Sequence, residues 1–317
     1  MKIEDYTEKV ITPETAISLL STDEVVILPT ETVYGLAANA YSHIATKKVF
    51  DIKKRPYRNP LIVHYYSMEQ AQRDLFFNDI ALKLAREFWP GPLTLITHRK
   101  RSSELSSLAS SNMSKVAVRI PLHPITLEII RKFGNPIVMP SANLYQMTST
   151  TNICDAICSL QKVLGVNGGY SYYGVESTII DCSRETPSIL RYGAIPCSVI
   201  EQKLDLKLYT YTDGKRMPGS HNKHYCTNKP IRMNASHVEP NEALLAFGEH
   251  NINAEISLNL SKMGNLKEAA RKLFYSLQRL DRSNCESIAV MPIPNEGIGI
   301  TINDRLKRAC FSERKHF

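Results

Sequence analysis

The sequence lacks any apolar run that approaches the ~20 residues a membrane-spanning helix requires, so no membrane span is expected. Its opening segment, MKIEDYTEKV, mixes acids with bases and has no apolar stretch after it, which is not the pattern of a secretory signal. The seven cysteines form no CxxC pair, and their odd number favours reduced thiols over a disulfide framework. These absences favour a cytoplasmic protein without a membrane anchor.

Common catalytic signatures are also missing. There is no Walker A sequence, and Gly297 and Gly299 in EGIGI do not form a GxGxxG fingerprint. The GxSxG turn of serine hydrolases is absent, so a nucleophilic serine is not indicated. Cys154 and Cys158 could share a helix face, but no neighbouring residues complete a metal site, and metal ligands stay undetermined. If the chain binds ATP, its pocket is therefore not a P-loop.

What the sequence does have is length and positive charge. A chain of 317 residues with 43% apolar composition suits two compact domains, each with its own core. The net charge of +8 indicates polyanionic ligands, which include nucleic acid as well as a nucleotide triphosphate. The densest basic stretch lies at the C-terminus, where we expect the solvated face of a last helix rather than an RNA contact. Its cations are Arg305, Lys307, Arg308, Arg314 and Lys315.

Hydrophobic periodicity predicts alternating helices and strands, with polar residues gathered at strand ends. Thr12 is the expected N-cap of a helix that has Pro13 in its first turn, and Gly134 is expected to end another. The expected helices are 12–20, 44–52, 69–75, 79–88, 125–133, 266–280 and 303–310. The expected strands are 25–28, 61–64, 93–97, 116–120, 136–139, 177–181, 188–191, 243–247 and 287–291. We expect a mixed α/β domain over 1–204, a linker over 205–235 and a small α/β domain over 236–317.

Several polar residues lie where strands or helices end, and each has an ordinary alternative role. Lys53 and Arg55 suit a triphosphate, or else a solvated basic helix end. Arg119 follows an apolar strand and requires a partner, which is either a ligand carboxylate or an Asp or Glu of the same protein. His64 is either a core residue or a catalyst. Short residues at other strand ends either orient a ligand or cap helices: Ser141, Asn143, Ser177 and Thr178.

Taken together, six segments resemble the YrdC family in wording and order. They are PTETVYGL (29–36), KKRPYRNPLIVH (53–64), WPGPLTLI (89–96), VAVRIP (116–121), PSAN (140–143) and VESTIID (175–181). ILRYG (189–193), PGSHNKHY (218–225) and the C-terminal segments extend the match, so nearly the whole chain is similar to the two-domain threonylcarbamoyl-AMP synthases. The resemblance implies a YrdC-like twisted mixed sheet with a deep basic cavity. It also implies a following linker that acts as a lid, and a small C-terminal Rossmann-like α/β domain.

The resemblance implies an activity as well. L-Threonine, bicarbonate or CO2, and ATP with Mg2+ would give L-threonylcarbamoyladenylate and pyrophosphate. A separate transferase would deliver the product to tRNA, as threonylcarbamoyladenosine at position 37, and a weak direct contact with tRNA is left open. Two other classes remain: a double-stranded RNA or ribosome-binding module, and another carbamoyl-transfer enzyme. The second domain and the placing of the cations at strand ends favour the synthase.

Carried over position by position, the resemblance implies two groups of site residues. The threonine pocket would contain Thr32, His64, Arg119, Met139 and Ser177, with Arg119 pairing the substrate carboxylate and Met139 contributing its backbone. The nucleotide would contact Lys53, Arg55, Asn59, Lys115, Ser141, Asn143, Ser149, Arg191 and Tyr225, the last as part of the lid. We further expect His64 to accept a proton from the threonine amine, and Arg55, Lys53 and a metal to stabilise charge on the phosphates.

Overall fold

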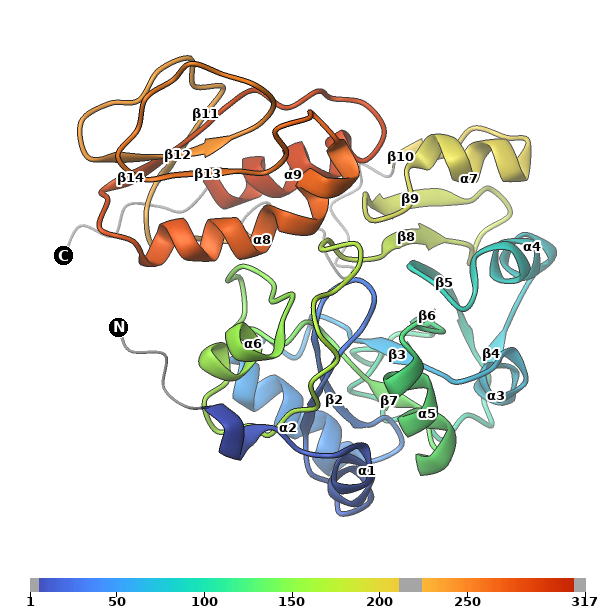
Figure 1. Cartoon of the computed structure of the whole chain (residues 1–317). Helices are drawn as coiled ribbons and strands as arrows, with labels where there is room; N and C mark the ends of the chain where they lie inside the picture. Colours follow the sequence, from blue (N-terminus) through green and yellow to red (C-terminus); the bar gives the residue numbers. More distant parts are fainter. Residues whose placement is uncertain (1–5, 211–223, 311–317) are drawn as a thin grey trace.

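The computed structural model describes residues 6–210 and 224–310, and within them the chain forms two α/β units, each built on its own sheet (Figure 1). The larger sheet holds ten strands in the order β1-β2-β7-β3-β6-β5-β8-β9-β10, with β4 paired to β5. The smaller sheet holds four parallel strands in the order β11-β14-β12-β13. The expected fold class is thus confirmed. No helix of the described residues is both long and apolar enough to cross a membrane.

The elements of the first unit begin with the 3-10 helix η1 (Tyr6–Lys9). Its α-helices are α1 (Pro13–Ser21), α2 (His43–Lys53), α3 (Met68–Asp74), α4 (Asp79–Phe88), α5 (Pro124–Phe133), α6 (Ile153–Ser159) and α7 (Cys197–Leu204). Its strands are β1 (Val26–Leu28), β2 (Gly35–Asn39), β3 (Ile62–His64), β4 (Leu75–Phe76), β5 (Leu93–Arg99), β6 (Lys115–Arg119), β7 (Ile137–Val138), β8 (Thr178–Asp181), β9 (Ser188–Arg191) and β10 (Tyr209–Thr210). The second unit contains β11 (Ile231–Met233), β12 (Glu242–Ala246), β13 (Ser257–Asn259), α8 (Leu266–Arg282), β14 (Ser287–Val290) and α9 (Gly299–Cys310).

Local signals explain several of the helix ends. The Thr12 hydroxyl accepts a hydrogen bond from the Thr15 amide at 3.3 Å, and Pro13 occupies the first turn of α1, where its missing amide costs nothing. Gly134 closes α5 with a φ of 86°, a left-handed conformation that glycine adopts without strain. Both ends were predicted from the sequence. The strand β2, GLAAN, was not predicted, because alanine has little preference for strands and only packing places it there.

Strands of both sheets fall within the expected linker over 205–235. At its start, β10 extends the large sheet by pairing in parallel with β9. Near its end, β11 is a strand of the small sheet, with Ile231 opposite Ile288 of β14. All three residues of β11 are half-buried, so the strand has no alternating pattern that a sequence could show. The central residues of the expected linker, 211–223, lie outside the described residues, as do Arg314 and Lys315.

The two faces of the large sheet are covered differently. One face packs on the main core, to which α2, α3, α4, α6 and α7 contribute. On the other face, α1 and α5 cover the strands β1, β2 and β7. That second face continues across β3, β6 and β8, where the small cluster around Ile96, Ala117 and Ile179 includes no described helical residue. Figure 1 shows α8 and α9 lying between the small sheet and the first unit.

Gly193, which is separated from the end of β9 by Tyr192, is tightly packed against the start of β8. A Cβ atom on Gly193 would lie 2.3 Å from both the carbonyl carbon of Ser177 and the amide nitrogen of Thr178. Because these are backbone atoms, they cannot rotate away. We expect Gly193→Ala to lower the free energy of unfolding by about 1–3 kcal/mol, measured by urea denaturation. Glu185→Ala, at an exposed position, should change it by less than about 0.5 kcal/mol, and equal effects would contradict the argument.

Candidate functional site

A small cavity lies on the face of the large sheet that the first unit's helices leave open. Its volume is about 70 Å³. The structure brings most of the predicted site residues to its wall: Thr32, Arg55, His64, Arg119, Met139, Ser141, Ser177, Arg191 and Tyr225. Residues from both predicted groups, the threonine group and the nucleotide group, therefore line one space.

Strand register explains how distant residues meet at one end of this cavity. β3 and β6 are parallel, and His64 is the register partner of Arg119, so the two side chains project from the same face of adjacent strands. β5 and β8 run antiparallel to β6, and therefore Ser177, just before β8, lies at the edge where β6 ends. Arg191 ends β9 at this edge too, since β9 is antiparallel to β8.

The other end of the cavity is built around the residues that follow β7. The Met139 amide donates to the Ile62 carbonyl at 3.0 Å, which places Met139 and Ser141 beside the start of β3. A Cβ atom on Gly35 would lie 2.3 Å from Cγ of Met139, so the glycine of PTETVYGL allows this close approach. The cavity thus extends along the short strand β3, from the residues beside its start to His64 at its end. The sequence predicted polar residues only at strand ends.

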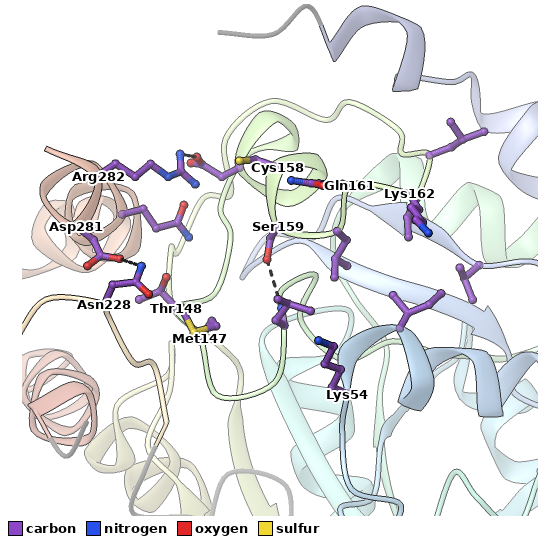
Figure 2. Close-up of a pocket in the computed structure, with 18 of the residues that line it drawn as sticks. Lys54, Met147, Thr148, Cys158, Ser159, Gln161, Lys162, Asn228, Asp281 and Arg282 are labelled. Carbon is purple, nitrogen blue, oxygen red and sulfur yellow. Dashed lines mark hydrogen bonds and ion pairs between the residues drawn. The ribbon is translucent and has the colours of Figure 1, made fainter. Parts of the chain in front are cut away.

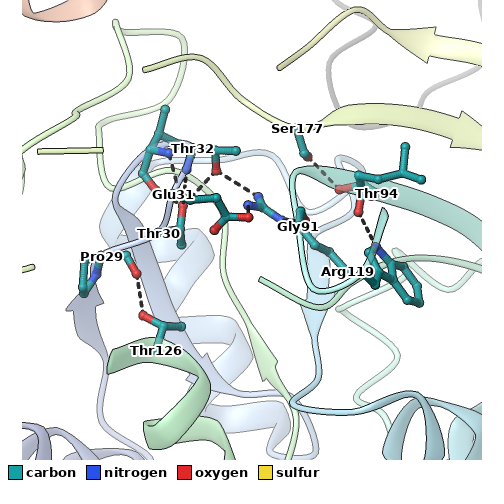
Figure 3. A network of polar contacts seen from close by, with 12 residues as sticks. Pro29, Thr30, Glu31, Thr32, Gly91, Thr94, Arg119, Thr126 and Ser177 are labelled. Carbon is teal, nitrogen blue, oxygen red and sulfur yellow. Dashed lines mark hydrogen bonds and ion pairs between the residues drawn. The ribbon is translucent and has the colours of Figure 1, made fainter. Parts of the chain in front are cut away.

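Arg119 is held by the protein itself, as Figure 3 shows. Its Nη2 donates to Oε1 of Glu31 at 2.6 Å, its Nη1 to Oγ1 of Thr32 at 2.9 Å, and its Nε to the Gly91 carbonyl at 3.1 Å. Of the two kinds of partner considered for Arg119, the structure shows a carboxylate of the same chain. Glu31 was not predicted as a site residue, although it is the acid of the PTET motif and precedes Thr32.

His64 is only 2% exposed and carries no charge at neutral pH. Burial lowers the pKa of His64 well below 6.5, and the nearby Arg119 guanidinium lowers that pKa further. Nδ1 of His64 lies 3.2 Å from the Ile62 carbonyl. When Nδ1 carries the ring proton and donates it to this carbonyl, Nε2 is left as a hydrogen-bond acceptor. The neutral ring can accept a hydrogen bond from a ligand, but its low pKa makes it a weaker base than free imidazole.

Two further arginines are fixed by neutral oxygens. Arg191 donates through Nε and Nη2 to the Ser177 carbonyl at 3.1 and 2.9 Å, and through Nη2 to the Ser177 hydroxyl at 3.0 Å. Arg55 donates to the carbonyls of Asn59 at 3.0 Å and Pro60 at 2.8 Å. Burial lowers the pKa of Arg55 to about 10, which leaves it charged at neutral pH. Together with Arg119, they give the cavity three oriented guanidinium groups suited to anionic oxygens.

Three predicted nucleotide residues support the cavity from behind and do not line it. Lys53, only 1% exposed, donates from Nζ to the backbone carbonyls of Ser141 and Asn143. Burial lowers the pKa of Lys53 well below its usual value, and Arg55 adds to the effect. The Asn143 side chain bonds to carbonyls within its own loop, and Asn59 donates to the hydroxyl of Tyr145 at 2.8 Å. These residues hold the PSAN loop in place, and their contact with a nucleotide stays a prediction.

Two other predicted residues also lie away from the wall. Lys115 begins β6, at the opposite end of the strand from Arg119, and its Nζ lies 3.4 Å from Oδ2 of Asp181. A contact of Lys115 with the cavity is therefore not supported. Ser149 is fully buried and donates to Oε1 of Glu176 at 2.5 Å.

Glu176 lines the cavity and was not predicted, and His224 of the HY pair, expected with Tyr225 as part of the cover, lines it too. Burial alone would raise the pKa of Glu176, but Arg305 and Arg191 lower it to about 2, so the carboxylate stays charged. Burial lowers the pKa of His224 to about 3, which keeps that ring neutral. Both residues belong to motifs recognised in the sequence, Glu176 to VEST and His224 to HY.

The expectation that Arg305 belongs to a solvated helix face was wrong, because its side chain is 0% exposed.

Comparison with known proteins agrees with this geometry. Residues 18–193 match the Sua5–YciO–YrdC family, described as telomere recombination, and residues 195–310 match the threonylcarbamoyl-AMP synthase C-terminal domain. The threonylcarbamoyl-AMP synthase of Bacillus subtilis is 33% identical over 93% of this chain and 92% of its own length. That of Pyrococcus abyssi is 31% identical over 90% of each. The chain belongs to the threonylcarbamoyl-AMP synthase family.

Solved structures of this family's fold extend the agreement. The crystal structure of Sua5 from P. abyssi complexed with L-threonine matches with a TM-score of 0.85 at 29% identity, and covers 94% of both chains. YciO from Escherichia coli matches with a TM-score of 0.52 at 21% identity. YciO covers 57% of this chain and 88% of its own length, so the likeness shows the fold of the first unit alone.

A larger groove of about 1030 Å³ lies where the first unit meets α8, and the charges of its lining differ from those of the smaller cavity (Figure 2). Its charged residues are of both signs and largely satisfied: Arg282 pairs with Asp155 at 2.9 Å, and Asn228 donates to Asp281 at 2.9 Å. None of the predicted site residues lines it. Size alone therefore does not mark the candidate site, whereas convergent cations do.

The described residues contain no group of three or more His, Cys, Asp or Glu side chains that could hold a metal ion. Glu176, which lines the cavity, and Glu31, which adjoins it through Arg119, are each bound to an arginine. This donor set does not fit a metal held by the protein, and no step is derived through one.

The buried neutral His64 gives a pH-dependent contribution to stability. Its pKa is lowered in the folded protein, so below pH 6.5 the unfolded chain binds a proton that the folded chain does not, and stability falls as the pH falls. We expect this contribution to reach up to about 2 kcal/mol between pH 7 and pH 5. His64→Gln should reduce the difference in unfolding free energy between the two pH values by that amount, measured by urea denaturation. An unchanged difference would show that His64 is not held neutral.

Proposed function

We propose that this chain is an L-threonylcarbamoyladenylate synthase, a nucleotidyltransferase that condenses L-threonine, bicarbonate or CO2, and ATP into threonylcarbamoyl-AMP and pyrophosphate. The observation that carries the proposal is a single cavity that joins three oriented arginines to the small polar residues Thr32 and Ser177. Family membership over both units and the match to a relative crystallised with L-threonine support the same conclusion.

Arg119 is the proposed partner of the threonine carboxylate. An arginine has five N–H donors, and three of those on Arg119 are engaged by Gly91, Thr32 and Glu31. One hydrogen remains on each Nη nitrogen, and this pair can hold both oxygens of a carboxylate. The substrate therefore does not have to displace Glu31 in order to bind.

Arg55 and Arg191 are the proposed partners of the triphosphate, with Ser141 beside them. A volume of about 70 Å³ is far below the ~300–1,000 Å³ of usual ligand sites, so ATP requires the cavity to widen. His224 and Tyr225 line the cavity, and Tyr225 has a φ of 64°, unusual for a residue with a side chain. We assign these two residues as the cover that moves when the nucleotide enters.

The chemistry follows in two balanced steps. The neutral threonine amine bonds to the carbon of CO2 and passes one proton to water, which leaves a carbamate. An oxygen of the carbamate then attacks the α-phosphorus, and the bond from phosphorus to pyrophosphate breaks. The charges of Arg55 and Arg191 stabilise the negative charge that develops on the phosphates, and a cavity closed to water protects the carbamate. Neutral His64 orients the amine by accepting a hydrogen bond, and Mg2+ would enter only as part of the ATP substrate, with no ligands from this cavity.

Delivery to tRNA is assigned to a separate transferase, with threonylcarbamoyladenosine at position 37 as the product. The activated acyl adenylate must be consumed by a group-transfer enzyme, because such a mixed anhydride hydrolyses in water. We also propose that the chain acts in the cytoplasm and contacts tRNA only weakly.

The activity is tested directly. The purified chain is incubated with ATP, Mg2+, bicarbonate and L-threonine, and pyrophosphate and the acyl adenylate are measured, the latter by mass. We expect both products to depend on threonine and on bicarbonate. Pyrophosphate release without any threonine-dependent adenylate would overturn the synthase assignment.

A paired substitution tests the role of Arg119 without destabilising the fold. Removing Arg119 alone leaves the buried Glu31 carboxylate unpaired, which costs about 3–5 kcal/mol of stability, so Arg119→Met is combined with Glu31→Gln. We expect the double variant to bind threonine at least about 10-fold more weakly, since two charge-assisted hydrogen bonds are lost. ATP affinity should stay close to that of the wild type. Calorimetry with each ligand measures both, and Glu31→Gln alone is the control; unaltered threonine binding in the double variant would remove the assignment.

A further inference from the structure

Arg305 is the largest fully buried side chain of the described residues, and it belongs to the second unit. It projects from α9, and its Nε donates to Oε2 of Glu176 at 2.8 Å. Its Nη2 donates to the Tyr192 carbonyl at 2.7 Å, and its Nη1 bonds to the neighbouring Asp304. A charge this deeply buried is stable only when it is fully paired, and its partners Glu176 and Tyr192 belong to the first unit.

Glu176 connects this pair to the cavity. Its side chain lines the cavity, while its two oxygens accept hydrogen bonds from Ser149 and from Arg305. The carboxylate therefore lies in a space whose arginines are arranged for anions. An unpaired negative charge there would repel a triphosphate and would attract Arg191, which lies near enough for the two charges to interact.

Arg305 also contacts the cover of the cavity. Its Cζ lies 4.9 Å from the centre of the Tyr225 ring, within the range of a cation–π contact. Phe274 of α8 packs against the same ring at 5.3 Å between centroids. One side chain of the second unit thus touches both an acidic residue of the cavity wall and the aromatic residue that covers it.

We propose that Arg305 is a positioning residue for the nucleotide, by which the second unit completes the anion site of the first. It neutralises Glu176, which leaves the charges of Arg55 and Arg191 free for phosphate oxygens, and it supports Tyr225. This inference rests on the proposed synthase function, because it takes the anion to be ATP. The Glu176 carboxylate in the wall of the ATP site is then neutralised only when α9 is docked.

The test uses the full chain and compares three variants. Arg305→Met removes the charge, and Arg305→Met with Glu176→Gln removes both charges of the pair. Thr301→Val is the matched control, since Thr301 lies on α9 and donates across the same interface to the Gly193 carbonyl at 2.9 Å without contacting the cavity. ATP and threonine affinities are measured by calorimetry, and kcat and KM for ATP by pyrophosphate release.

We expect Arg305→Met to weaken ATP binding at least about 10-fold, with threonine affinity changed by less than about 3-fold. Adding Glu176→Gln should restore ATP affinity to within about 3-fold of the wild type, because no buried carboxylate is then left unpaired. Thr301→Val should leave ATP affinity unchanged even if it lowers the unfolding temperature. Rescue by a second substitution that adds no contact is a result that a purely structural role of Arg305 does not give.

Several outcomes would overturn the inference. ATP binding by Arg305→Met that equals the wild type would do so, and so would a loss that Glu176→Gln fails to restore. If Arg305→Met does not fold, Arg305→Lys replaces it: the retained charge should keep ATP affinity within about 3-fold, and a 10-fold loss contradicts the charge argument. A wild-type chain that binds no ATP refutes the proposed function itself, and is distinguished from these outcomes because no variant is involved.

Discussion

Holding several guanidinium groups around one small space is the constraint on which the remaining structure depends. Like charges at this distance repel, and burial removes the water that would solvate them. The chain meets this constraint with oxygens at fixed positions, namely carbonyls at the ends of strands and two buried carboxylates. The cations are therefore oriented before any ligand arrives, which is what a site for charged substrates needs.

Residues that do not line the cavity hold its wall in place. Lys53 donates hydrogen bonds from Nζ to two carbonyls of the PSAN loop, and the Asn143 side chain donates to a carbonyl of the same loop. Gly35 and Gly193 leave space where one backbone segment approaches another. Each of these residues fixes the position of a neighbouring segment, and those segments form the wall of the cavity.

Much of the fold could be predicted from the sequence, because caps, apolar periodicity and turn residues act locally. Thr12 and Gly134 ended helices where expected, and the strands that carry His64 and Arg119 were located correctly. The partners of charged groups could not be predicted in this way. Arg305 and Glu176 are 129 residues apart in sequence, and neither shows a local sign of its partner. Composition placed Arg305 on a solvated face, and only the docking of α9 buries it.

The charges of the cavity divide in a way that suits two different substrates. Arg119 is matched by Glu31, and Arg305 by Glu176, so both pairs are neutral overall. Arg55 and Arg191 make no ion pair with a described carboxylate, and the excess positive charge lies with them. A triphosphate requires that excess, whereas an amino acid is a zwitterion and suits an ion pair that offers both signs. Oε2 of Glu31 is buried and has no hydrogen-bond partner among the described residues, which leaves an acceptor beside the arginine that would hold the carboxylate. The same balance of charge that lets the arginines stay buried therefore places an ion pair, Arg119 with Glu31, and two arginines without an ion pair, Arg55 and Arg191, around one space.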